Sequence, residues 1–190
     1  MQQAIADRRW AFVADYVRLY ALYHEGGVYF DTDVKLYHDV SEIMREGEVV
    51  IPTQTSISTG YNLMCAVIAA VPGHPFIKKC LDYYANLTYD PENFRKAIIN
   101  PIMSRILHDG WDYRYENICQ KLPDGIIILD RTYFESSFDI TDRKYSKFLG
   151  VHFCNQSWVP HKRGAIYTFC KSNDLMGLYK FITKCISVFL

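Results

Sequence analysis

Hydrophobic and polar positions near the start of the chain predict a helix followed by a short strand. Across residues 10–23, apolar side chains recur at helical spacing and predict an inward face made of Trp10, Val13, Ala14, Val17, Tyr20 and Ala21. Further aliphatic and aromatic residues cover much of the remaining surface, so we expect the helix to be buried on more than one side. Gly26 and Gly27 suit a helix end that needs positive φ. Residues 28–30 then predict a short buried strand.

The rest of the chain predicts further strands and helices in alternation. The expected elements are a buried strand at 49–51, a polar loop at 53–60, a helix at 76–87, two helical pieces within 91–110, and strands at 126–129 and 151–154. Prolines set several boundaries: Pro52 ends the strand before it, Pro75 begins a helix, and Asn100-Pro101 separates the two helical pieces. His74 lies between prolines at a helix start, and we interpret it as structural.

Composition narrows the class of protein. The chain has 190 residues, 49% of them hydrophobic and 15% aromatic, which fits one domain with a sizeable core. Its 21 basic and 21 acidic residues balance, which argues against a general nucleic-acid binder. The six cysteines form no Cys-x-x-Cys pair and indicate reduced, mostly buried thiols in a cytosolic protein, with a disulfide framework as the alternative. Residues 178–190 are apolar and predict a terminal helix that packs on the core or, alternatively, rests on a membrane surface.

Two aspartates, Asp31 and Asp33, directly follow the first predicted strand. In an extended segment their side chains point the same way. Two close carboxylates repel each other unless a cation lies between them, and Mg²⁺ and Mn²⁺ prefer carboxylate oxygens. The pair therefore indicates a metal site at the carboxyl end of a strand, where open α/β folds place their ligands. The alternative is an ordinary polar turn after a strand.

The surroundings of this pair favour the metal site. Residues 14–18 read Ala-Asp-Tyr-Val-Arg, so that Asp15 and Arg18 share a helix face, and residues 26–34 read Gly-Gly-Val-Tyr-Phe-Asp-Thr-Asp-Val. This arrangement resembles the core signature of the DXD-containing sugar transferases of glycosyltransferase family 32. The resemblance implies an α/β protein with a GT-A-like nucleotide-diphospho-sugar transferase fold, in which helices flank a Rossmann-like mixed sheet.

A later stretch, residues 150–158, resembles the closing motif of the same family, a histidine followed by a Ser-Trp pair. The resemblance implies catalytic roles for Asp31 and Asp33 and a site that holds Mn²⁺ or Mg²⁺. The implied ligands of the cation are Asp33, His152, Asp31 and Asn155. The implied contacts to the donor sugar are Asp15, Arg18 and Asp31, and those to its diphosphate are Ser157 and Trp158.

The implied activity is metal-dependent transfer of a sugar, with retention, from a UDP- or GDP-sugar donor to a hydroxyl of a glycan or lipid-linked acceptor. The setting implied is surface polysaccharide synthesis in the cytoplasm, at the inner face of the membrane. Family members begin with a further strand region that is missing here, so we expect an N-terminally incomplete catalytic domain over 1–171 and an amphipathic helix over 172–190. We also expect weak binding of nucleotide-sugar.

Two other functions remain open from the sequence. A haloacid-dehalogenase-type phosphatase also places Asp-x-Asp after a strand, with Mg²⁺ and the first aspartate as nucleophile. A non-catalytic module that binds sugar-nucleotide without turnover is the second, because of the missing strand region.

Overall fold

The computed structural model describes residues 2–7, 9–56, 60–87, 90, 97–136 and 148–153. In chain order the elements are α1 (Gln2–Ala6), α2 (Trp10–His24), β1 (Gly27–Phe30), β2 (Val34–Leu36), the 3₁₀ helix η1 (Ile43–Arg45), β3 (Val49–Ser56), β4 (Gly60–Leu63), β5 (Val67–Ala70), α3 (Pro75–Asn86), α4 (Ile99–Trp111), β6 (Gln120–Leu122), β7 (Ile126–Leu129), β8 (Phe134–Ser136) and β9 (Gly150–His152).

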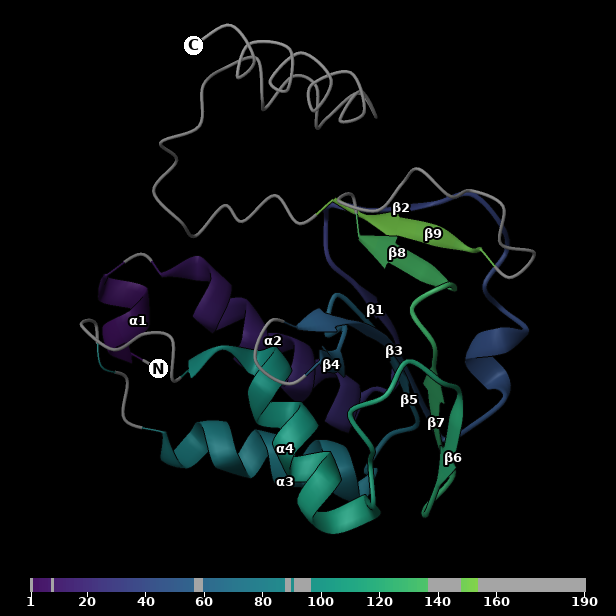
Figure 1. Ribbon diagram of the computed structural model, residues 1–190. Helices are drawn as coiled ribbons and strands as arrows, with labels where there is room; N and C mark the ends of the chain where they lie inside the picture. Colours follow the sequence, from purple (N-terminus) through teal and green to yellow (C-terminus); the bar gives the residue numbers. More distant parts are fainter. Residues whose placement is uncertain are drawn as a thin grey trace, which may run out of the picture.

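The strands form two sheets. The larger has the order β1-β5-β3-β7-β6, and β4 pairs with β3 off this path. It is a mixed sheet, because β3 and β7 run parallel while β1, β4, β5 and β6 pair antiparallel with their neighbours. The smaller sheet has the order β2-β9-β8 and lies beyond one end of the larger one (Figure 1). The predicted α/β class with a mixed sheet and flanking helices is confirmed.

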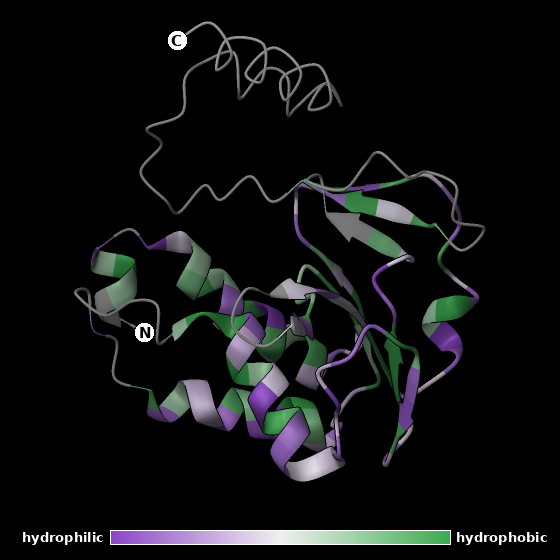
Figure 2. Ribbon diagram, in the orientation of Figure 1, coloured by the Kyte–Doolittle hydropathy of each residue, from purple (hydrophilic) through white to green (hydrophobic). Residues whose placement is uncertain are grey.

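Helices α2, α3 and α4 lie together on one side of the larger sheet (Figure 1). The alternation of side chains along β3 explains this layer, because Val49 and Ile51 belong to the cluster that contains the buried faces of these helices. Val50 lies between them and points to the opposite side, where it packs in a second cluster with Ile127 and Phe134. Figure 2 shows β7 as hydrophobic and its edge neighbour β6 as hydrophilic, as expected for a central and an outer strand.

Helix α3 follows its predicted pattern. It begins at Pro75, and five of the six side chains expected inward are buried: Phe76, Ile77, Cys80, Leu81 and Tyr84. The sixth, Leu87, follows the end of the helix at Asn86 and is only partly buried. His74 caps the helix, since its Nδ1 accepts a hydrogen bond from the Phe76 amide at 3.2 Å, and its Nε2 lies 2.9 Å from the carbonyl oxygen of Asp124. Both ring nitrogens therefore have structural partners, which agrees with the structural interpretation of this residue.

The predicted boundary at Pro52 is wrong, because β3 continues through this proline to Ser56. Pro52 lies where β3 changes partners on one side: Val49 and Val50 pair with β5, whereas residues 53–56 pair with β4. Proline has no backbone N–H to donate. It is tolerated at this point because no β5 residue pairs with it, so no acceptor on β5 is left without a donor. Its carbonyl oxygen still accepts a bond of 2.7 Å from the Met64 amide. The expected polar loop at 53–60 is therefore strand over its first four residues.

The position predicted for the helix break, Asn100-Pro101, is also wrong, and most of the first helical piece lies outside the described residues. Asn100 and Pro101 are the second and third residues of α4, which starts at Ile99 and runs without interruption to Trp111. Amides in the first turn of a helix have no intrahelical acceptor, so a proline there removes no hydrogen bond.

The buried face of α2 differs from the predicted one. Trp10 is 60% exposed, and Val17 and Tyr20 are also exposed, although the spacing placed them inward. The buried side chains are instead Phe12, Asp15, Arg18, Leu19 and Leu22. Aromatic and aliphatic residues occur all round this helix, so apolar spacing alone does not select the inward face.

Strand β1 was expected to be buried and is only partly so. Within the described residues it pairs with β5 alone and forms one edge of the larger sheet. Val28 is accordingly 43% exposed, while Tyr29 and Phe30 are half-buried. No helix in the described ranges is long and apolar enough to cross a membrane. The helix expected over 172–190 lies outside the described residues.

Candidate active site

A sharp reversal between α2 and β1 brings two charged segments together. Gly26 and Gly27 have φ of 68° and 95°, in the left-handed region that favours glycine. A Cβ on Gly26 would lie 2.6 Å from Cδ of Pro72, so the close approach to the turn after β5 also requires glycine. The chain therefore turns back on itself, and the end of β1 comes to lie beside the middle of α2.

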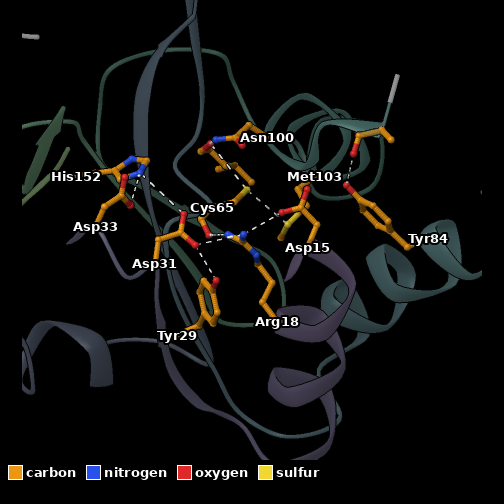
Figure 3. A network of polar contacts seen from close by, with 12 residues as sticks. Asp15, Arg18, Tyr29, Asp31, Asp33, Cys65, Tyr84, Asn100, Met103 and His152 are labelled. Carbon is orange, nitrogen blue, oxygen red and sulfur yellow. Dashed lines mark hydrogen bonds and ion pairs between the residues drawn. The ribbon is translucent and has the colours of Figure 1, made fainter. Parts of the chain in front are cut away.

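Asp31 lies at the centre of the resulting polar network. Its Oδ1 accepts a hydrogen bond of 2.7 Å from the Tyr29 hydroxyl and lies 3.2 Å from Nη2 of Arg18. Its Oδ2 points the other way, 3.9 Å from Nε2 of His152. Figure 3 shows Asp31 between the Arg18 guanidinium on one side and Asp33 with His152 on the other. The two oxygens of this carboxylate thus face different neighbourhoods.

Arg18 is held beneath Asp31 by several contacts. It is 6% exposed, its Nη1 donates to the Cys65 carbonyl oxygen at 2.5 Å, and its Nη2 lies 2.9 Å from Oδ1 of Asp15. Its guanidinium lies over the Tyr29 ring, 4.6 Å from the centroid. Among the described residues its Nε is buried and has no hydrogen-bond partner.

Asp15 links this network to α4. It is 7% exposed, and the Ile99 amide at the start of α4 donates a hydrogen bond to it. This contact satisfies one of the amides that a helix leaves unpaired at its N-terminus. Burial raises the pKa of Asp15 to about 7, although Arg18 beside it acts to lower the pKa. Burial also raises the pKa of the Tyr29 hydroxyl, which therefore stays protonated and donates to Asp31.

The first turns of α4 also hold the segment that carries the Cys65 carbonyl. Nδ2 of Asn100 donates to the Leu63 carbonyl oxygen at 2.9 Å, and Oγ of Ser104 accepts from the Leu63 amide at 2.9 Å. The end of β4 is therefore fixed on α4 two residues before Cys65. This explains how a backbone carbonyl is presented to Arg18.

The smaller sheet brings His152 to the aspartates. Strand β9 pairs with β2 so that His152 lies opposite Val34, and the Phe153 amide donates to the Asp33 carbonyl oxygen at 2.9 Å. Nε2 of His152 then lies 3.2 Å from Oδ1 of Asp33. One ligand atom from each of Asp31, Asp33 and His152 lies within 4.8 Å of the others. Residues that are far apart in sequence thus meet as predicted.

This group fits a divalent cation. Two ligands bound at right angles to an octahedral ion, each at roughly 2.1 Å, lie about 3 Å apart. The 3.2 Å between Nε2 of His152 and Oδ1 of Asp33 matches this value, whereas the 3.9 Å between Nε2 of His152 and Oδ2 of Asp31 is wider. Two carboxylates favour Mg²⁺ or Mn²⁺, and the imidazole favours Mn²⁺ of the two. Which ion binds stays a prediction.

Three predicted site residues lie outside the described part of the chain: Asn155, Ser157 and Trp158. Their implied roles as a cation ligand and as diphosphate contacts stay predictions. The sequence reasoning assigned no role to Tyr29, although it lies two residues before Asp31 and so points to the same side of β1. It could not have found the Cys65 carbonyl or the Ile99 amide, because backbone groups carry no signal in the sequence.

Comparison with known proteins places a recognised region at the start of the chain. Residues 1–50 match the family model described as "Glycosyltransferase sugar-binding region containing DXD motif". This matched region contains Asp15, Arg18, Asp31 and Asp33, so the predicted resemblance to DXD glycosyltransferases is confirmed for it. The narrower assignment to glycosyltransferase family 32 stays a prediction.

Among solved structures, the chain is similar to one titled "PaToxG Glycosyltransferase", with 24% sequence identity and a TM-score of 0.44. The match covers 57% of this chain and 38% of that one. The chain therefore spans well under half of the length of that neighbour. A search of curated proteins finds no match.

Proposed function

We propose that this chain carries the metal-dependent catalytic site of a glycosyltransferase, which moves a sugar from a nucleotide-sugar donor to a hydroxyl of a glycan or lipid-linked acceptor. The observation that carries the proposal is the meeting of Asp31, Asp33 and His152 at the end of β1. Two of these residues belong to the matched DXD region. The third comes from a separate strand far along the chain.

In this proposal, Asp33 and His152 hold a Mn²⁺ or Mg²⁺ ion, and Asp31 offers its Oδ2 to the same ion. When bound, such an ion stabilises the negative charge that grows on the leaving diphosphate as the glycosidic bond breaks. Oδ1 of Asp31 stays bonded to the Tyr29 hydroxyl and close to Arg18, so Oδ2 is oriented before the donor binds.

Asp15 and Arg18 contact donor-sugar hydroxyls in this proposal, as the resemblance implies. Both Nη atoms of Arg18 already have partners, whereas its buried Nε has none in the described part of the chain. A buried charged donor without an acceptor is costly. Because this Nε is buried, the assignment of Arg18 to the donor sugar rests on the family resemblance.

The remaining parts of the proposal rest on the family resemblance. Asn155 adds a further ligand to the ion, and Ser157 and Trp158 contact the diphosphate. Transfer proceeds with retention, and the leaving phosphate accepts the proton of the acceptor hydroxyl on the front face. The acceptor belongs to surface polysaccharide synthesis at the inner face of the membrane.

A donor screen tests the proposal. The full chain is incubated with Mn²⁺ and a panel of UDP- and GDP-sugars, and nucleoside diphosphate release is measured. We expect release with at least one donor. Asp33→Ala should lower the rate by roughly 10²–10³, the loss typical of one fixed electrostatic group. Asp82→Ala is the matched control, because Asp82 is an exposed aspartate paired with Lys78 on α3.

Two outcomes would contradict the proposal. Phosphate release from simple phosphomonoesters, without release of nucleoside diphosphate from any donor, would indicate a phosphatase. Binding of a nucleotide-sugar without turnover would indicate a non-catalytic module.

A further inference from the structure

We propose that Tyr29 is a positioning residue that orients Asp31 for the cation, an inference that rests on the proposed function. The Tyr29 hydroxyl donates to Oδ1 of Asp31 at 2.7 Å, while Oδ2 of the same carboxylate faces His152 at 3.9 Å. A hydrogen bond to one oxygen restricts how far the plane of the carboxylate can turn. Tyr29 therefore helps to set the direction in which the second oxygen faces His152.

The position of the Tyr29 hydroxyl is itself fixed. Tyr29 and Asp31 are two residues apart at the end of β1, so both side chains leave the backbone on the same side. The ring is half-buried, packs against the core beneath the helices, and lies under the Arg18 guanidinium at 4.6 Å. Backbone register and ring packing thus place the hydroxyl before any ligand binds.

Arg18 alone would hold Asp31 less well. Its Nη2 is shared, lying 2.9 Å from Asp15 and 3.2 Å from Asp31. Its Nη1 is occupied by the Cys65 carbonyl oxygen. The shorter of the two contacts to Asp31 is the hydrogen bond from the Tyr29 hydroxyl. Deleting that one oxygen atom removes this bond and leaves the contact with Arg18.

The test is Tyr29→Phe, which deletes this hydroxyl and keeps the ring beneath Arg18. Mn²⁺ affinity of the full chain is measured by titration under electron paramagnetic resonance, which reports free Mn²⁺ and needs no donor or turnover. We expect affinity to fall about tenfold, the lower end of the range for groups that orient metal ligands.

Tyr84→Phe is the matched control. Its hydroxyl also donates one hydrogen bond, at 2.8 Å, but to the Ala97 carbonyl oxygen, away from the metal group (Figure 3). Both variants lose one tyrosine hydroxyl hydrogen bond, so both should lower the thermal midpoint. A structural role alone would leave Mn²⁺ affinity equal in the two variants, whereas a positioning role weakens it only in Tyr29→Phe.

The outcomes separate this inference from the proposed function. Wild-type affinity for Mn²⁺ in Tyr29→Phe would overturn the inference and leave the metal site standing. Absence of Mn²⁺ and Mg²⁺ binding by the wild-type chain would overturn the proposed metal site, and the inference with it.

Discussion

Replacing Asp15 with asparagine tests the electrostatics beneath the candidate metal group. The change keeps the shape of the side chain and leaves an oxygen for the Ile99 amide, but it removes the group that titrates. Asp15 is almost fully buried and has Arg18 beside it at 2.9 Å. Burial and the cation act in opposite directions on its pKa, and burial is the larger effect.

The magnitude follows from the pKa of Asp15, which rises from 3.8 to about 7 on folding. Between these values, the folded state holds a proton that the unfolded state has released. The free energy of unfolding therefore falls with pH in this window, by roughly 1.4 kcal/mol per pH unit. The contribution is fully present below pH 3.8 and is lost as pH rises through about 7. Over the whole window the loss is about 4 kcal/mol.

The assay is urea unfolding of wild type and Asp15→Asn at several pH values between about 4.5 and 7.5, comparing free energies of unfolding extrapolated to water. Other titrating groups are common to both proteins and cancel in the difference. We expect wild type to lose stability relative to Asp15→Asn as pH rises, by about 3 kcal/mol over this range. A difference that grows in favour of wild type with pH would show that the Arg18 ion pair outweighs burial, and would refute the reasoning.

Two further predictions concern local contacts, and both are measured as free energies of unfolding in urea. Thr53→Val should stabilise the fold by about 1 kcal/mol, because Oγ1 of Thr53 is buried without a partner in the described ranges. Ser104→Ala, which removes a hydroxyl bonded to the Leu63 amide, should instead destabilise by about 1 kcal/mol; a loss in both variants would contradict the assignment of Thr53. Gly26→Ala should lower the free energy of unfolding more than Gly27→Ala does. Both glycines have positive φ, but a Cβ at Gly26 would lie 2.6 Å from Cδ of Pro72, whereas a Cβ at Gly27 would meet nothing within 4 Å. The strain of positive φ is roughly 1–2 kcal/mol in each variant, so equal losses would mean that the close approach at Gly26 is absent.

The elements with strong local signals could be predicted from the sequence. Helix α3 has a proline start, a capping histidine and a clear apolar face, and it forms as expected. Asp31 and Asp33 directly follow a strand that begins after two glycines, and the structure places them beside Arg18 and His152 as the family resemblance implied. In each case, several local features favoured the same structure.

Where the predictions failed, tertiary context decided between equally good local choices. Apolar residues surround α2, so its inward face is set by the positions of α3 and the sheet, and Trp10 is left exposed. Strand β1 has the composition of a buried strand but lies at a sheet edge in the described part of the chain. Pro52 was predicted to end a strand and Pro101 to break a helix. Each instead lies inside its element, at a position where no amide donor is needed.

The network beneath Asp31 shows a different limit. The Cys65 carbonyl and the Ile99 amide hold the charged side chains in place, and any residue except a proline at the second position could supply the same backbone group. A sequence pattern identifies charged residues, but it does not identify the backbone groups that orient them.

The most direct test of the central claim is pulsed electron paramagnetic resonance of the chain loaded with Mn²⁺, which detects nitrogen bonded to the ion. The account predicts an imidazole ¹⁴N coupling in wild type that persists in His24→Ala, an exposed histidine on α2. The coupling should disappear in His152→Ala, at Mn²⁺ concentrations high enough to keep the weakened site filled. Bound Mn²⁺ without a nitrogen coupling in wild type, or a coupling that survives in His152→Ala, would contradict a site built from Asp31, Asp33 and His152.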